Sequence, residues 1–141
     1  MRARAHVVAL LMWLLVTAAA PAKAPKNEIL GTWRGTSLCT KIPGNESCHD
    51  ETVLYEFTDV PNSPDSVHVN ALKMVNGKFE SMGEIDFRYE PARHRWTSEF
   101  STRRGHAVWV FWVRGNAVTG KLHELPDSTV TRNVSARRKP A

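Results

Sequence analysis

The chain is poor in cysteine and has no long hydrophobic run. Only two of its 141 residues are cysteines, and the longest unbroken apolar run is Val7–Val16. A membrane-spanning helix needs about 20 apolar residues, so this run is too short and we expect no stable membrane insertion. Cys39 and Cys48 are also too far apart for the C-x-x-C arrangement of a redox pair.

Sequence motifs of enzymes are missing as well. The chain contains no G-x-S-x-G, no H-E-x-x-H and no phosphate-binding glycine loop. The triplet His49-Asp50-Glu51 carries acid–base groups, but neighbouring residues on a strand point to opposite faces. Hydrogen bonding at a loop end is therefore the better interpretation of this triplet. We predict a non-enzymatic protein without catalytic residues and without a cofactor.

Positive charge is scattered along the chain instead of being gathered in one place. The formal net charge is +5, and removal of residues 1–22 would take away Arg2 and Arg4 and leave +3. Nucleic-acid binding usually needs a basic stripe with exposed aromatic side chains, whereas Arg137-Arg138-Lys139 is only a short basic tail. The histidines after residue 22 form no i, i+2 pair. We predict neither nucleic-acid binding nor a metal site.

The first 22 residues have the features of an export signal. Arg2 and Arg4 precede the apolar run, and Ala20-Pro21-Ala22 supplies the small residues of a cleavage site. We predict a signal peptide at residues 1–22, a flexible linker at residues 23–28 and a barrel domain at residues 29–138. The protein is then secreted or periplasmic.

The two cysteines bracket a turn that contains Pro43-Gly44. In an oxidising compartment, this arrangement is typical of a disulfide that closes a hairpin loop. We therefore predict a Cys39–Cys48 bond. Closing so short a loop stabilises a fold by roughly 2–3 kcal/mol through the entropy of the unfolded chain.

Alternating apolar and polar residues run through the rest of the chain and predict strands. Turn signals such as Asn76-Gly77 separate eight of them, at residues 29–40, 51–58, 66–75, 78–89, 96–101, 105–113, 118–124 and 128–138. We predict an all-β fold, an eight-stranded antiparallel up-and-down meander closed into a β-barrel, because eight strands suffice for closure and closure removes edge strands. A sandwich of two four-stranded sheets is the alternative.

Aromatic side chains recur at alternate positions of these strands. We take six of them as ligand-binding candidates: Tyr55, Phe57, Phe87, Trp96, Phe100 and Trp112. Aromatic rings bury roughly 150–250 Å² each and can also fill a small barrel. The sequence is therefore compatible with two interiors, a barrel with a ligand cavity and a barrel filled by its own side chains.

The strand at residues 105–113 is apolar on both faces. Val108, Val110 and Trp112 share one parity, and Trp109, Phe111 and Val113 share the other. We predict that Trp109 and Phe111 face outward as a surface patch, because contiguous exposed apolar side chains usually mark a contact. A homodimer formed through residues 108–113, or cover by the linker, would bury this patch.

The first strand opens with Gly31-Thr32-Trp33, a G-x-W element. In this feature the chain resembles the lipocalin and calycin group of barrels, as a minimal bacterial type. The resemblance implies that an arginine of the last strand packs over Trp33, and Arg132 is the matching residue. The second lipocalin element, a T-D-Y-like turn, is absent, and Arg114-Gly115-Asn116 occupies its place.

This lipocalin-like resemblance implies that the barrel binds a small apolar ligand in its mouth. The alternative is an envelope or extracellular interaction protein or inhibitor that acts through its outer surface around a filled core. Haem-binding nitrobindins also open with a G-x-W element, so haem binding is a further alternative. His123, however, shares the parity of Thr119 and Lys121 and is expected to face solvent.

Overall fold

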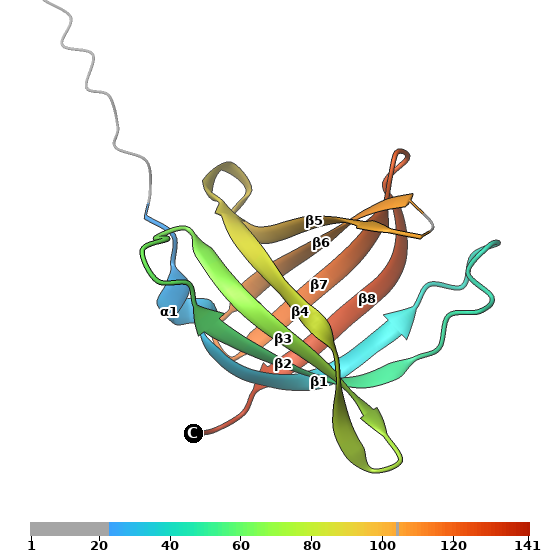
Figure 1. Cartoon of the computed structure of the whole chain (residues 1–141), viewed down its shortest axis with the longest axis horizontal. Coiled ribbons are helices and arrows are strands. Elements are labelled where there is room, and N and C mark those ends of the chain that lie inside the picture. The colour runs from blue at the N-terminus through green and yellow to red at the C-terminus, as the bar shows by residue number, and fades with distance from the viewer. Residues whose placement is uncertain (1–22, 104) are drawn as a thin grey trace, which may run out of the picture.

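The chain forms a closed barrel of eight antiparallel strands, each hydrogen-bonded to the strands before and after it (Figure 1). The computed structural model describes residues 23–103 and 105–141, so the predicted signal peptide at residues 1–22 lies outside the described residues. The strands are β1 Gly31–Cys39, β2 Glu51–Asp59, β3 Ser66–Val75, β4 Lys78–Glu90, β5 Arg95–Thr102, β6 Gly105–Arg114, β7 Ala117–Glu124 and β8 Thr129–Arg138. The predicted all-β, up-and-down closed barrel is confirmed.

Local sequence determines where the strands turn. Asn76 and Gly77, between β3 and β4, have φ values of 47° and 81°, the left-handed pair that a type I′ hairpin requires. A short helix, α1 (Lys26–Ile29), precedes β1, and a 3₁₀ turn, η1 (Pro91–Arg93), joins β4 to β5. The remaining connections are loops and turns between neighbouring strands, so the chain order is also the order around the barrel.

A β-bulge in β4 reverses the faces that its side chains occupy. Ala71 pairs with Gly83 and Leu72 pairs with Ser81, which leaves Met82 as an extra residue. Such a bulge shifts the alternation by one position. Phe79 shares the parity of Gly83 and is therefore expected to point inward, but it lies on the outer face, where the Arg34 guanidinium is 5.4 Å from its ring centre.

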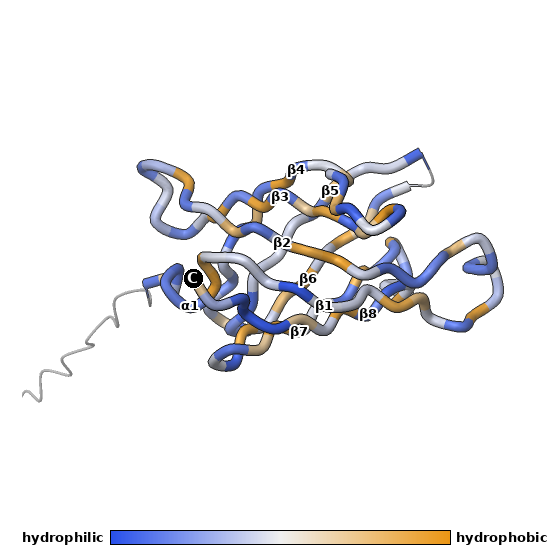
Figure 2. The backbone as a smooth tube through the Cα atoms, turned by 90° about the horizontal axis from the view of Figure 1, so that it is seen from below, coloured by the Kyte–Doolittle hydropathy of each residue, from blue (hydrophilic) through white to orange (hydrophobic). Residues whose placement is uncertain are grey.

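The hydrophobic core fills the half of the barrel nearest α1. Its largest side chains, each at most 2% exposed, are Trp33, Phe57, Phe87, Trp96 and Phe111. The ring centre of Phe111 lies 5.3 Å from that of Phe87 and 5.9 Å from that of Phe57, with the ring planes steeply inclined, as aromatic pairs prefer. Figure 2 shows hydrophobic stretches along strands that supply this core, including β2 and β6.

Trp33 and Arg138 close the barrel end beside α1. Trp33 is fully buried, and its Nε1 donates a hydrogen bond to the Ile29 carbonyl at 2.7 Å. The Arg138 guanidinium lies 4.2 Å from the centre of the Trp33 ring, and its nitrogens donate to the carbonyls of Leu30 and Glu28. One arginine of the last strand therefore fixes both the indole and the segment that leads into β1.

The prediction that Arg132 packs over Trp33 is wrong. In the antiparallel pairing of β1 with β8, Trp33 lies opposite Arg138, whereas Arg132 lies opposite Cys39 at the other end of the barrel. Arg132 and Arg138 share the parity of the buried Val134 and Ala136. Parity therefore places both arginines toward the interior and does not decide which of them meets the indole.

We expect Arg138→Ala to lower the free energy of unfolding by about 2–3 kcal/mol, because it removes a cation–π contact and two charge-assisted hydrogen bonds. Arg138→Lys should be less destabilising than Arg138→Ala but still below the unchanged protein, since lysine keeps the charge and lacks the planar guanidinium that stacks on the ring. Urea unfolding checks both values. Arg137→Ala, at the exposed neighbouring position, is the control and should change stability by less than about 0.5 kcal/mol. Equal losses at Arg137 and Arg138 would contradict the role assigned to Arg138.

The predicted flexible linker at residues 23–28 is partly an ordered element, because residues 26–28 belong to α1. Ile29, the last residue of α1, is fully buried in the core. Lys26 also forms an ion pair with Asp59 at the end of β2. Through these contacts α1 packs against the same end of the barrel that Trp33 closes.

Candidate functional site

The barrel end opposite α1 holds a cavity of about 430 Å³. Its apolar wall consists of Tyr55, Val69, Ala71, Met82, Ile85, Phe87, Phe100, Trp109, Phe111 and Leu122. Tyr55, Phe87 and Phe111 also belong to the buried core, so they form the floor of the cavity. The volume lies within the range of roughly 300–1,000 Å³ that is usual for small-molecule sites.

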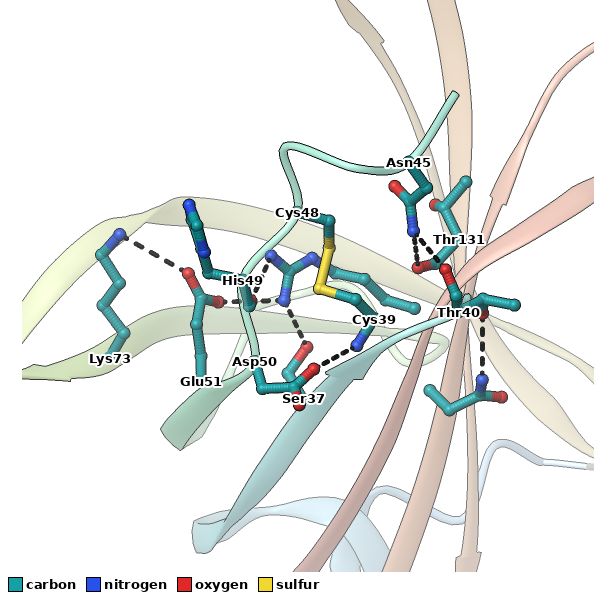
Figure 3. The surroundings of a disulfide bond; sticks show 12 residues. Ser37, Cys39, Thr40, Asn45, Cys48, His49, Asp50, Glu51, Lys73 and Thr131 are labelled. Carbon is teal, nitrogen blue, oxygen red and sulfur yellow. Dashed lines mark hydrogen bonds and ion pairs between the residues drawn. A yellow bond between two sulfur atoms is a disulfide. The ribbon is translucent and has the colours of Figure 1, made fainter. Parts of the chain in front are cut away.

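Polar side chains meet at one side of the cavity rim. Arg132 Nη1 donates to Ser37 Oγ at 3.1 Å and to Glu51 Oε2 at 3.2 Å. Arg132 Nη2 donates to the His49 carbonyl at 3.1 Å. Lys73 Nζ lies 3.5 Å from the other carboxylate oxygen of Glu51 (Figure 3). The Arg132 and Glu51 side chains are 18% and 20% exposed, so their charges face each other at the mouth of the cavity.

A disulfide-closed loop stands beside this rim (Figure 3). Cys39 and Cys48 are bonded, as the sequence predicts. Asp50 Oδ1 accepts a hydrogen bond from the Cys39 backbone N–H at 2.8 Å, which agrees with loop-end hydrogen bonding by the His49-Asp50-Glu51 triplet. The Asn45 side-chain amide donates to the carbonyls of Thr40 and Thr131. The loop is thus attached to both β1 and β8.

The phenol of Tyr55 supplies a polar group to the cavity floor. Burial raises the pKa of Tyr55, and the negative charge of Glu51 raises it further. The phenol therefore keeps its proton throughout the physiological range. It adds a neutral hydroxyl to the floor, and no charge.

The six predicted ligand-binding candidates fall into three groups. Tyr55, Phe87 and Phe100 line the cavity. Phe57 and Trp96 are buried in the core nearer to α1 and do not line it. Trp112 is half-buried on the outer face, because it alternates with the inward Phe111. The sequence thus identifies three of the five aromatic residues of the cavity wall and misses Trp109 and Phe111.

The predicted surface patch of Trp109 and Phe111 is wrong, because both rings point inward. They stack on each other, with ring centres 5.7 Å apart, and both line the cavity. Phe111 lies opposite Gly120 on β7, where the absence of a side chain leaves room for its ring. On the outer face of β6, Val108 and Trp112 are half-buried, whereas Val110 is only 2% exposed. Self-association through residues 108–113 stays a prediction, and Val108 and Trp112 are the outward side chains of β6 that a second copy could contact.

The polar rim is a further part of the site that the sequence did not predict. A signal for it was present, since Glu51 shares the parity of Val53 and Tyr55, and Arg132 shares that of Val134. A charged residue at the end of an inward-facing series indicates a polar barrel mouth. The register that joins Glu51 on β2 to Arg132 on β8 across β1 becomes visible only in the folded chain.

A second charged cluster lies outside the barrel on β3 and β4. His68 Nδ1 is 2.6 Å from Asp86 Oδ1, and His68 Nε2 is 3.5 Å from Glu84 Oε2. The hydrogen bond with Asp86 is the main cause of a raised pKa at His68. Because the Glu84 and Asp86 side chains are largely exposed and His68 is partly exposed, we assign this cluster only a small effect on stability.

We expect the pKa of His68 to lie above its usual 6.5 in a proton NMR titration. Asp86→Asn should lower this pKa more than Glu84→Gln does, since the Asp86 contact is shorter. A raised folded-state pKa means that the stabilising contribution is complete below pH 6.5 and disappears as the pH rises through the folded-state value. Equal effects of the two substitutions would contradict the dominance of Asp86.

Among residues 23–103 and 105–141, no three histidine, cysteine or acidic side chains are grouped so that they could hold a metal ion. No helix in the described part of the chain is long and apolar enough to span a membrane. Neither a protein-family model nor a curated protein matches the sequence.

Proposed function

We propose that the protein is an exported, non-enzymatic lipocalin-like barrel that binds a small, neutral, apolar molecule in the cavity at its open end. The observation that carries the proposal is the apolar chamber of about 430 Å³ above the ring floor of Tyr55, Phe87 and Phe111. The opposite end is closed by Trp33 and Arg138. A ligand would therefore enter a pocket with one sealed end.

A lipocalin-like assignment is supported by three features together. The barrel has eight antiparallel strands in up-and-down order. Its first strand begins with Gly31-Thr32-Trp33, and an arginine of its last strand packs over that tryptophan. Export is supported by the Cys39–Cys48 disulfide, since such bonds persist mainly in oxidising compartments.

The charges at the rim favour a neutral ligand. Arg132 is 3.2 Å from Glu51, and the second oxygen of Glu51 is 3.5 Å from Lys73. A charged ligand would lose its hydration in the apolar chamber and would have to compete with these partners for a counter-charge. A neutral molecule avoids both costs and can still use the Tyr55 hydroxyl.

Two fluorescent probes of similar shape test the proposal. N-phenylnaphthylamine is neutral, and anilinonaphthalene sulfonate carries a negative charge. We expect the neutral probe to bind and to quench Trp109, with at least tenfold higher affinity than the sulfonated probe.

Ala71→Phe should fill part of the cavity and weaken binding of the neutral probe at least tenfold. Ala92→Phe, the same substitution at an exposed position of η1, is the matched control. Unchanged binding in the Ala71→Phe protein would place the probe elsewhere and refute the proposed site.

A further inference from the structure

The barrel is laterally open between β4 and β5. Only Arg88, Tyr89 and Glu90 of β4 pair with β5, opposite Thr97, Trp96 and Arg95. β4 remains paired with β3 back to Lys78, and β5 remains paired with β6 as far as Thr102. Among the described residues, the segments 78–87 and 98–102 therefore each have a neighbouring strand on one side only. Figure 1 shows β4 turning away from β5 beyond the short paired region.

The hydrogen bonds show which backbone groups face this gap. Tyr89 N–H donates to the Asp65 carbonyl on the β3 side at 2.8 Å. Backbone groups of successive residues in an antiparallel strand point to alternate sides. The backbone N–H and C=O groups therefore point toward β3 at Tyr89, Phe87 and Ile85. At Asp86 and Glu84 they point toward β5. In the described part of the chain, no strand pairs with Asp86 and Glu84 on that side.

The inner side of the gap leads into the cavity. Ile85 and Phe87 on β4 and Phe100 on β5 all line it. Met82 is 41% exposed at the bulge, where the cavity reaches the surface. A strand added along β4 would direct every second side chain between these residues, into the apolar chamber.

The outer side of the same gap is acidic. Glu84 and Asp86 on β4 and Glu99 on β5 are exposed. Arg88 Nε is already paired with Asp65, 3.5 Å from its Oδ2. The His68 ring contacts Asp86 and Glu84 and is charged only when protonated, so an added basic side chain would share these two carboxylates with it. The outward side chains of an added strand would therefore meet carboxylates.

We propose that the β4 edge at residues 83–87 binds an extended segment of another polypeptide as an added strand. The backbone of this segment pairs with Glu84 and Asp86. Its outward side chains are basic and contact the carboxylates of β4 and β5, and its inward side chains are apolar and enter the cavity. Main-chain pairing supplies affinity in this mode of recognition, and alternate side chains supply specificity. The proposal does not require a small-molecule ligand, although a bound ligand would compete for the cavity.

A set of acetylated and amidated peptides, Lys-X-Lys-X-Lys with X as Val, Leu, Phe or Trp, tests this interface in NMR titrations of the full barrel. We expect at least one member to bind and to protect the Glu84 and Asp86 amides from hydrogen exchange. The matching Glu-X-Glu-X-Glu peptide should bind at least tenfold more weakly. No binding by any Lys-X peptide at millimolar concentration, or equal binding of the acidic peptide, would overturn the proposal.

Backbone pairing is tested separately from charge. Asp86→Ala removes the carboxylate but keeps the N–H, whereas Asp86→Pro removes both at an edge position that tolerates proline. We expect binding to Asp86→Pro to be at least fivefold weaker than binding to Asp86→Ala. Should Asp86→Pro fail to fold, N-methylation of the central lysine of the peptide makes the same test. Methylation of the neighbouring apolar residue, whose N–H points away from β4, is its control. Strand addition would be overturned if Asp86→Pro and Asp86→Ala bound the peptide equally well, or if the two methylated peptides bound the barrel equally well.

Small-molecule binding and strand binding can fail independently in these experiments. Peptide binding without probe binding would refute only the proposed small-molecule function. Probe binding without peptide binding would refute only strand addition. Competition between the neutral probe and a bound peptide is expected if both occupy the cavity beside Phe100, and independent binding would overturn the placement of the inward side chains.

Discussion

Replacing Gly35 with alanine is expected to destabilise the barrel by about 4 kcal/mol or more. A Cβ at Gly35 would lie 1.9 Å from the Ser135 carbonyl oxygen and 2.5 Å from the Ala136 Cα. Both contacts are with the backbone of β8, so no side-chain rotation can relieve them. The ladder between β1 and β8, which closes the barrel, would have to separate. Urea unfolding followed by circular dichroism measures the loss.

Thr36→Ala is the matched control for this substitution. Thr36 is the next residue of β1 and is exposed on the outer face, so its loss should change stability by less than about 1 kcal/mol. Ser37 and Arg132 meet along the same β1–β8 junction at the cavity rim. Weakening of the junction should therefore also reduce binding of the neutral probe. A Gly35→Ala protein as stable as the Thr36→Ala protein would contradict the close backbone approach.

The strands and the closure of the barrel could be predicted because their causes are local. Alternation identifies each strand, and Asn76-Gly77 supplies the backbone conformation of its hairpin without help from the rest of the fold. The Cys39–Cys48 bond follows in the same way from two cysteines around one turn.

Two features could not be predicted: which side of the barrel wall a side chain occupies, and which residues pair across neighbouring strands. Both depend on pairing between distant segments. The extra residue Met82 moves Phe79 to the outer face, and nothing in the alternation of β4 marks the bulge. Thr131 is a similar extra residue in β8, between the partners of Leu122 and His123. The pairing with β1 then decides that Arg138, and not Arg132, meets Trp33.

The gap between β4 and β5 is also invisible in the sequence. Both flanking segments alternate as ordinary strands, and the edge arises because β4 and β5 diverge after their short paired region. Edge strands are commonly protected by charges that oppose further pairing. Glu84, Asp86 and Glu99 would repel an acidic or a second identical edge and would accept a basic segment. The same residues thus limit aggregation and select the partner that we propose.

Phe111→Ala is expected to lower the free energy of unfolding by about 3–5 kcal/mol, the usual loss when a buried phenylalanine is truncated. Phe111 is 2% exposed, and its ring centre lies within 6 Å of those of Tyr55, Phe57, Phe87 and Trp109. Val108→Thr, on the outer face of the same strand, should cost less than about 1 kcal/mol. Similar losses at the two positions would contradict the inward placement of Phe111, and chemical unfolding of both variants decides the matter.

Gly120 offers a second test of the same packing. A Cβ at Gly120 would lie 2.5 Å and 2.6 Å from two ring atoms of Phe111, and the ring is held by its aromatic neighbours. Gly120→Ala alone should therefore cost about 1–3 kcal/mol through overpacking. In the Phe111→Ala background the ring is gone and the added methyl group occupies vacated space, so the same change should be neutral or stabilising. The two substitutions should then differ from additivity by at least about 1 kcal/mol. Additive losses would mean that Phe111 does not rest on Gly120 and that the floor of the cavity is built differently.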